Sequence, residues 1–145
     1  MKILEVKTPE RILGSFGERK AARYLKRNGY RILKRNFVAE GSEIDLIARK
    51  GDTIVFVEVK TRTSDAISPI EPRPASAVTP KKQQSIIRAA RVFCAFNPDE
   101  CKKRFDIVEV IVNFKNNRYV LAEIKHLQNT FNLNTAFAGY ERHKK

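Results

Sequence analysis

Two acids and one lysine lie in a stretch that is otherwise typical of two β-strands. Asp45 interrupts the apolar run of residues 44–48, and Glu58 and Lys60 end the run that begins at Thr53. The nearly continuous apolar run that begins at Thr53 predicts a strand that is buried on both faces. A carboxylate on such a strand needs a cation, a proton or a hydrogen-bond network to offset its lost hydration.

The turn between the two strands determines which residues face each other. If residues 51–52 form a two-residue turn, with Gly first as type II′ requires, Asp45 lies opposite Glu58 and Glu43 opposite Lys60. Because side chains alternate between faces, Glu58 and Lys60 share a face with Asp45. Opposed Cβ atoms are about 5 Å apart, a distance at which like charges repel. A divalent metal ion between Asp45 and Glu58 would convert that repulsion into binding.

Carboxylate ligands indicate a hard cation. Mg²⁺ or Mn²⁺ takes one or two carboxylates and completes its shell with water and substrate phosphate. Such an ion activates water and stabilises charge on the leaving oxygen. Lys60, two residues after Glu58, could orient or deprotonate that water. The pattern therefore predicts hydrolysis of a phosphodiester, whereas a simple salt bridge between Glu43 and Lys60 is the structural alternative.

A basic helix precedes these strands. Thr8 and Pro9 are a typical cap and first residue, and Gly29 is a typical stop after Asn28. Glycines at positions 14 and 17 are expected to break or loosen the first turns.

Glu18 lies on or beside the apolar stripe of this helix, while the bases cluster on the opposite side. Two interpretations remain open. Ser15 and Glu18 form a capping-box pattern, which would make Glu18 structural if the helix begins at Ser15. Alternatively, Glu18 reaches the Asp45–Glu58 pair and helps to hold the metal.

Charge and length restrict the class of protein. The chain has 145 residues, enough for one domain, and a net charge of +13. Residues 1–36 hold eleven Lys or Arg against three Glu. Such charge attracts phosphate backbones. Because no amphipathic segment is apolar enough on one side to favour a membrane surface, nucleic acid is the favoured partner. The charged N-terminus does not have the pattern of a signal peptide, so a cytoplasmic location is expected.

The remaining elements predict an α/β domain. A strand is expected over residues 30–38. A proline-rich loop over 61–79 carries Arg62 and Arg73, which could meet a substrate phosphate; a mobile insertion with no part in function is the alternative. A second helix runs from the Thr79 cap to Asn97, with Lys82 and Gln83 in its first turn. Two further strands are expected over 104–114 and 119–126. Residues 1–131 form one domain in this interpretation, and 132–145 form a basic tail.

Six motifs are spread along the chain: Gly17-Glu18-x-x-Ala21-Ala22-x-Tyr24-Leu25, Glu43-Ile-Asp-Leu-Ile-Ala48, Val55-Phe-Val-Glu-Val-Lys-Thr-Arg62, Lys82-Gln83, Arg104-Phe-Asp-Ile-Val108 and Ile124-Lys-His-Leu-Gln-Asn-Thr-Phe131. Together they resemble the bacterial YraN-like family of predicted endonucleases, and the resemblance covers about residues 14–131. The family is similar to archaeal Holliday-junction resolvases within the PD-(D/E)-x-K nucleases.

The resemblance implies a restriction-endonuclease-like fold, with a mixed central sheet of about five strands flanked by helices. It assigns Asp45 and Glu58 to the metal, Lys60 to the attacking water and Glu18 to an auxiliary metal or water contact. Lys82 and Gln83 match a further helix motif near the scissile phosphate. Branched or structured DNA is the implied substrate, and homodimer formation is a further expectation. The alternatives are a non-cleaving nucleic-acid-binding protein and a basic accessory protein that contacts ribosomal RNA or a protein.

Overall fold

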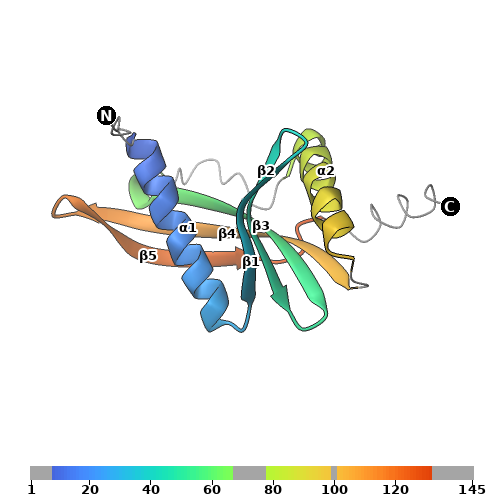
Figure 1. Cartoon of the computed structure of the whole chain (residues 1–145). Coiled ribbons are helices and arrows are strands. Elements are labelled where there is room, and N and C mark those ends of the chain that lie inside the picture. Colours follow the sequence, from blue (N-terminus) through green and yellow to red (C-terminus); the bar gives the residue numbers. More distant parts are fainter. Residues whose placement is uncertain (1–7, 67–77, 99–100, 132–145) are drawn as a thin grey trace, which may run out of the picture.

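Two helices and five strands make up the fold in the computed structural model, which describes residues 8–66, 78–98 and 101–131 (Figure 1). In chain order they are α1 (Pro9–Arg27), β1 (Arg31–Ala39), β2 (Ser42–Lys50), β3 (Thr53–Thr63), the short 3₁₀ turn η1 (Ser64–Ala66), α2 (Pro80–Phe96), β4 (Lys102–Lys115) and β5 (Arg118–Leu127). The strands form one sheet in the order β1-β2-β3-β4-β5. The pairing of β3 with β4 is parallel and the other three pairings are antiparallel. This mixed sheet with helices confirms the predicted fold class.

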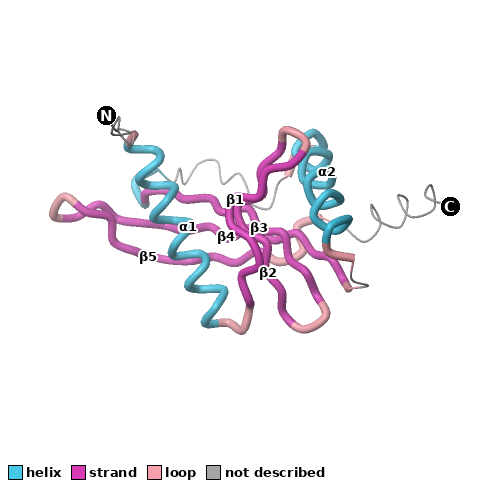
Figure 2. Tube along the Cα trace, viewed as in Figure 1, coloured by secondary structure: helices cyan, strands magenta, loops and turns pink. Residues whose placement is uncertain are grey.

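The two helices pack on opposite faces of the sheet (Figure 2). Successive residues of β3 alternate between them: Val55 and Val57 belong to the core under α1, and Ile54 and Phe56 to the core under α2. All four are buried, which explains why this segment is apolar at every position. β3 is therefore the central strand on which both cores depend.

Both helices begin as the sequence predicts. The Thr8 hydroxyl accepts a hydrogen bond from the Arg11 N–H, and the Thr79 hydroxyl accepts one from the Lys82 N–H. Gly29 follows α1 with a φ of +87°, a conformation that favours glycine. The expected break at the two helical glycines is wrong, because α1 is continuous from residue 9 to residue 27.

Gly17 has a packing role instead. A Cβ atom at this position would lie 1.7 Å from Thr61 Oγ1 and 2.8 Å from Thr61 Cβ, so α1 approaches β3 more closely than any side chain allows.

We expect Gly17→Ala to lower the free energy of unfolding by about 1–3 kcal/mol, because the helix must move away from the sheet. Thr61→Ala should restore part of that loss in the double variant. Chemical denaturation of the four proteins measures this coupling, and strictly additive effects would contradict the contact.

The segment after β3 differs in part from its prediction as a loop over 61–79. Residues 61–63 continue β3, residues 64–66 form η1, and Thr79 caps α2. Residues 67–77, with Arg73, lie outside the described residues, and so does the predicted tail over 132–145. Beyond β5 the chain is anchored, since the Thr130 N–H donates to the Phe105 carbonyl and the Phe131 ring lies 4.9 Å from the Phe105 ring.

Candidate active site

The site forms where β2 and β3 separate. Their residues pair in the predicted register from Lys50–Thr53 to Leu46–Val57, and the regular pairing ends there. Gly51 has a φ of +61° in the connecting turn, as a type II′ turn requires at its first central residue. Asp45 and Glu58 are the next residues on the two strands. They therefore lie at a fork in the sheet rather than inside a ladder, and the predicted opposition of Glu43 and Lys60 does not form.

The Asp45 carboxylate occupies this fork. Its Oδ2 accepts a hydrogen bond of 2.8 Å from the Val59 N–H, which has no strand partner on this side. Burial raises the pKa of Asp45; the Val59 hydrogen bond opposes this shift, and the charges of Glu58 and Glu43 add to it. Asp45 is thus held in a fixed position in surroundings that disfavour its charge.

A local irregularity sets the direction of this side chain. Ile44 packs in the core under α2, while Leu46 packs in the core under α1, although residues two apart normally share a face. On the neighbouring strand β1, Asn36 lies between the pairs Arg35–Leu46 and Phe37–Ile44 and has a φ of +51°. The register is the same on both sides of Asn36, so its left-handed backbone lies opposite the break in alternation at Asp45.

Asp45 and Glu58 line a common cavity of about 100 Å³. Its other lining residues are Glu43, Ile44, Val57, Lys82, Ile86 and Phe105. The three acids face a single base, since Lys82 Nζ lies 3.5 Å from Glu58 Oε1. The cavity therefore carries an excess of negative charge, held on hard oxygen ligands.

This donor set fits Mg²⁺ or Mn²⁺. Either ion commonly binds through one or two carboxylates with water and phosphate in its other positions. Within residues 8–66, 78–98 and 101–131, no three His, Cys, Asp or Glu side chains converge as ligands for one ion. The fit therefore rests on Asp45 and Glu58 as a pair.

Glu18 lies close to this site without lining the cavity. Because α1 begins at Pro9, the capping-box interpretation of Glu18 is wrong. Burial raises the pKa of Glu18, the charges of Asp45 and Glu43 raise it further, and the charge of Arg35 lowers it. These couplings place Glu18 within electrostatic reach of the acids at the fork, and its role as a metal contact stays a prediction.

The other predicted site residues are distributed around the fork. Lys82 reaches the cavity, as described above. Lys60 is partly exposed and, with the described residues, makes no ion pair within 4.0 Å. Gln83 donates from Nε2 to the Val78 carbonyl at 2.9 Å and therefore supports the chain that leads into α2. The catalytic roles of Lys60, Lys82 and Gln83 stay predictions.

Glu109 is a further acid near the site that sequence reasoning did not identify. Glu109 on β4 is only 8% exposed and pairs with Lys60 on β3 and with Lys125 on β5. It lies within residues 105–112, which are all buried and otherwise mostly apolar, and a carboxylate in such a run is the signal that could have identified it. Glu109 therefore lies beside Lys60, the residue predicted to act on the attacking water.

The sequence pattern also does not predict a buried hydrogen-bond network around Asp106 on the α1 side of the sheet. Asp106 is fully buried and accepts from Arg104 Nε and Nη2 at 2.8 Å each, and from the Asn129 N–H at 2.9 Å. His126 Nε2 lies 2.7 Å from Asp106 Oδ2, and Arg104 Nη2 donates to the Tyr30 hydroxyl at 2.7 Å. This network joins Tyr30, between α1 and β1, to β4 and β5, and we interpret it as structural.

No helix in the described part of the chain has the length and apolarity needed to cross a membrane.

Comparison with known proteins identifies the family. The model of the uncharacterised protein family UPF0102 matches residues 17–110, which is more than half of the chain. A UPF0102 protein of Chlorobium phaeobacteroides is 43% identical over 122 residues, covering 83% of this chain and 93% of the relative. UPF0102 proteins of Caldicellulosiruptor saccharolyticus and Geobacter metallireducens are 43% and 45% identical over 123 residues each; the matches cover 84% and 83% of this chain and 98% and 93% of those relatives. The chain belongs to the UPF0102 family, the YraN-like family that its motifs predict.

Proposed function

We propose that this protein is a metal-dependent endonuclease that hydrolyses phosphodiester bonds in branched or otherwise structured DNA. One observation carries the proposal: the carboxylates of Asp45 and Glu58 line one small cavity at a fork in the sheet. The chain as a whole has a charge of +13, so the excess of negative charge at this cavity is opposite in sign to the charge of the protein. A pure nucleic-acid-binding surface gains nothing from half-buried carboxylates that repel phosphate.

The residues at the fork have distinct roles in this proposal. Asp45 and Glu58 would hold Mg²⁺ or Mn²⁺, and the Val59 N–H keeps the Asp45 carboxylate oriented. When bound, the ion would polarise the phosphate and make a water molecule more acidic. Lys60, two residues after Glu58, would orient that water or take its proton. Lys82 lies at the cavity and now pairs with Glu58. When substrate binds, Lys82 would contact the substrate phosphate instead.

A panel of substrates tests this function. Purified protein is incubated with labelled four-way junctions, flaps and linear duplexes in Mg²⁺, in Mn²⁺ and in chelator. We expect internal cuts in the metal-containing samples, with the branched substrates cut fastest, and none in chelator. Cutting that persists in chelator would exclude the metal mechanism, whereas binding without cutting would indicate a non-cleaving nucleic-acid-binding protein. Light scattering of the same samples tests the predicted homodimer.

Lys60 provides a more specific prediction. Lys60→Met should lower the cleavage rate by about a hundredfold or more, the scale of positioned acid–base catalysis, while metal affinity changes little. Stability should also change little, because this side chain is partly exposed and makes no ion pair with the described residues. Lys81→Met, at an exposed position on α2, is the matched control. Equal rates for Lys60→Met and the wild type would remove Lys60 from the chemistry.

A further inference from the structure

A second, larger hollow lies on the outer side of α1 and carries the opposite charge. It has a volume of about 540 Å³ and is lined by Phe16, Arg19, Lys20, Arg23, Lys26 and Arg35. Five of these six residues are bases and none is an acid. We call this hollow the α1 groove. A concentration of like charge of this kind is destabilising without an anionic ligand and raises the local concentration of anions.

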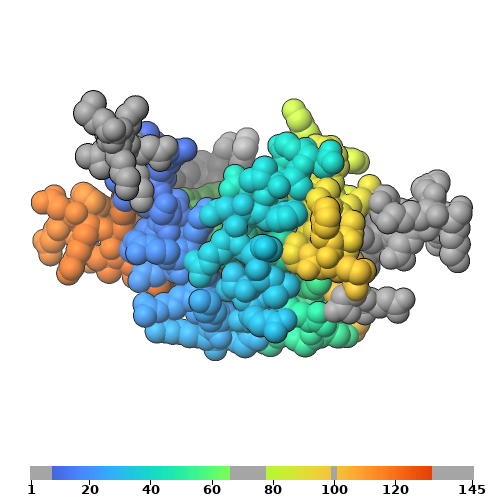
Figure 3. Space-filling model, in the orientation of Figure 1, coloured from blue at the N-terminus to red at the C-terminus, as the bar shows by residue number. Residues whose placement is uncertain are grey.

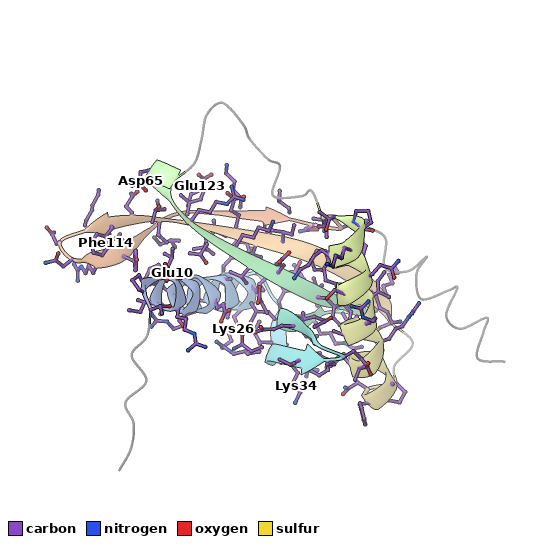
Figure 4. All side chains as sticks on the ribbon, turned by 90° about the horizontal axis from the view of Figure 1, so that it is seen from above. Glu10, Lys26, Lys34, Asp65, Phe114 and Glu123 are labelled. Atoms are coloured by element: carbon purple, nitrogen blue, oxygen red, sulfur yellow. The ribbon has the colours of Figure 1, made fainter. Side chains whose placement is uncertain are left out.

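The groove is formed by α1 and β1, which lie side by side on one face of the molecule (Figure 3). Figure 4 shows the same arrangement from above, with Lys26 labelled near one end of α1 and Lys34 on the neighbouring strand. Arg35 pairs with Leu46, the last residue of β2 before the fork. The charge of Arg35 also acts on Glu18, which in turn is coupled to Asp45. Arg35 and Glu18 therefore lie between the α1 groove and the acids at the fork, although the groove and the cavity share no lining residue.

The aromatic ring in the groove is not available for base stacking. Arg19 Cζ lies 5.9 Å and Lys20 Nζ 5.3 Å from the centroid of the Phe16 ring. These cation–π contacts hold both cations at the groove wall before any ligand arrives. Proteins that bind single strands stack bases on uncovered aromatic rings, so a covered ring favours contacts to the sugar-phosphate backbone.

We propose that the α1 groove binds the sugar-phosphate backbone of a DNA duplex that extends from the active site. This inference rests on the proposed function for the identity of the nucleic acid. Residues 16–26 of α1 span about 15 Å at 1.5 Å per residue, which corresponds to roughly four base pairs of a duplex. Contacts between these bases and phosphate groups carry no sequence information, so binding at the groove is expected to be independent of DNA sequence.

Binding measured in chelator tests the groove independently of cleavage. Arg23→Gln with Arg35→Gln removes two groove charges, and Lys34→Gln with Arg88→Gln removes two exposed charges outside the groove. We expect the groove variant to bind a duplex about tenfold or more weakly at about 0.1 M salt. The slope of log K against log[salt] should fall in magnitude by about 1.8, or 0.9 for each lost phosphate contact. The control variant should retain the wild-type slope.

The outcomes separate the two proposals. Equal losses in the groove and control variants, or no loss in either, would overturn the α1 groove as the binding surface. Tighter binding of duplex RNA than of duplex DNA would overturn the assignment of the ligand. If the wild type cuts no DNA but the groove variant alone loses binding, the groove stands and the nuclease proposal fails. If the groove variant binds and cuts as the wild type does, the groove fails and the nuclease proposal stands. Circular dichroism and thermal melting confirm that the variants are folded.

Discussion

Asp45→Asn is expected to abolish DNA cleavage while making the protein more stable. The substitution keeps an oxygen that can accept from the Val59 N–H, so the geometry at the fork is preserved. It removes one of the two carboxylate charges that would hold the ion. Since such an ion supplies several kcal/mol of transition-state stabilisation, we expect the cleavage rate to fall by about a thousandfold or more.

The opposite effect on stability has an electrostatic cause. Burial raises the pKa of Asp45, with the neighbouring charges of Glu58 and Glu43 adding to the shift, so the ionised form is costly in the folded protein. A neutral amide avoids that cost, and the melting temperature near pH 7 in chelator should rise. Asp52→Asn, in the exposed turn of the same hairpin, is the matched control; it should leave cleavage unchanged and should not raise the melting temperature. If Asp45→Asn cleaves DNA as fast as the wild type, Asp45 is not a metal ligand needed for cleavage. If its melting temperature is lower than that of the wild type, the charge of Asp45 does not destabilise the folded protein.

Asp106→Asn should cause the largest loss of stability among these variants. The amide cannot accept from both Arg104 nitrogens and from the Asn129 N–H as the carboxylate does, and it leaves the Arg104 charge without its counter-ion. Breaking a buried ion pair from one side costs about 3–5 kcal/mol. Chemical denaturation measures this loss. For comparison, Lys102 and Asp52 are 3.9 Å apart and largely exposed, and removing their ion pair should cost less than about 1 kcal/mol.

The pH dependence of unfolding provides a second test of the Asp106 network. Burial alone would raise the pKa of Asp106, but the hydrogen bonds from His126, Arg104 and Asn129 outweigh it and lower that pKa. A lowered pKa contributes stability above the ordinary value of about 4, and this stability is lost as the pH falls through the lower pKa of the folded state. Acid unfolding of the wild type should therefore include a contribution that Asp106→Asn lacks. Parallel stability curves of the two proteins below pH 4 would contradict this assignment.

The strand pairing could be predicted from the sequence because it follows from local rules. Side chains alternate with a period of two, and the Gly51 turn allows one register, so the positions of Asp45 and Glu58 on adjacent strands follow directly. The fork could not be predicted in this way. It coincides with the left-handed backbone of Asn36 on β1 and with the hydrogen bond from the Val59 N–H to Asp45, neither of which has a signature in the pattern of apolar residues.

Contacts between residues far apart in the sequence account for the other differences between the sequence-based predictions and the structure. Gly17 is unfavourable in an isolated helix, but Thr61, more than forty residues later, makes glycine necessary at the closest approach to β3. The partners of Asp106 likewise come from residues 104, 126 and 129, which only the folded sheet brings together. A buried acid in an apolar strand indicates that such partners exist, but it does not identify them.

Calorimetric titration with Mn²⁺ tests most directly the central claim that Asp45 and Glu58 together hold a divalent cation. The wild type should bind one ion per chain, and Glu58→Gln should bind it at least about tenfold more weakly, because one of two charged ligands becomes neutral. Glu123→Gln, at an exposed acid on β5 outside the cavity, should bind as the wild type does. Equal Mn²⁺ affinity in the wild type and Glu58→Gln would contradict the claim.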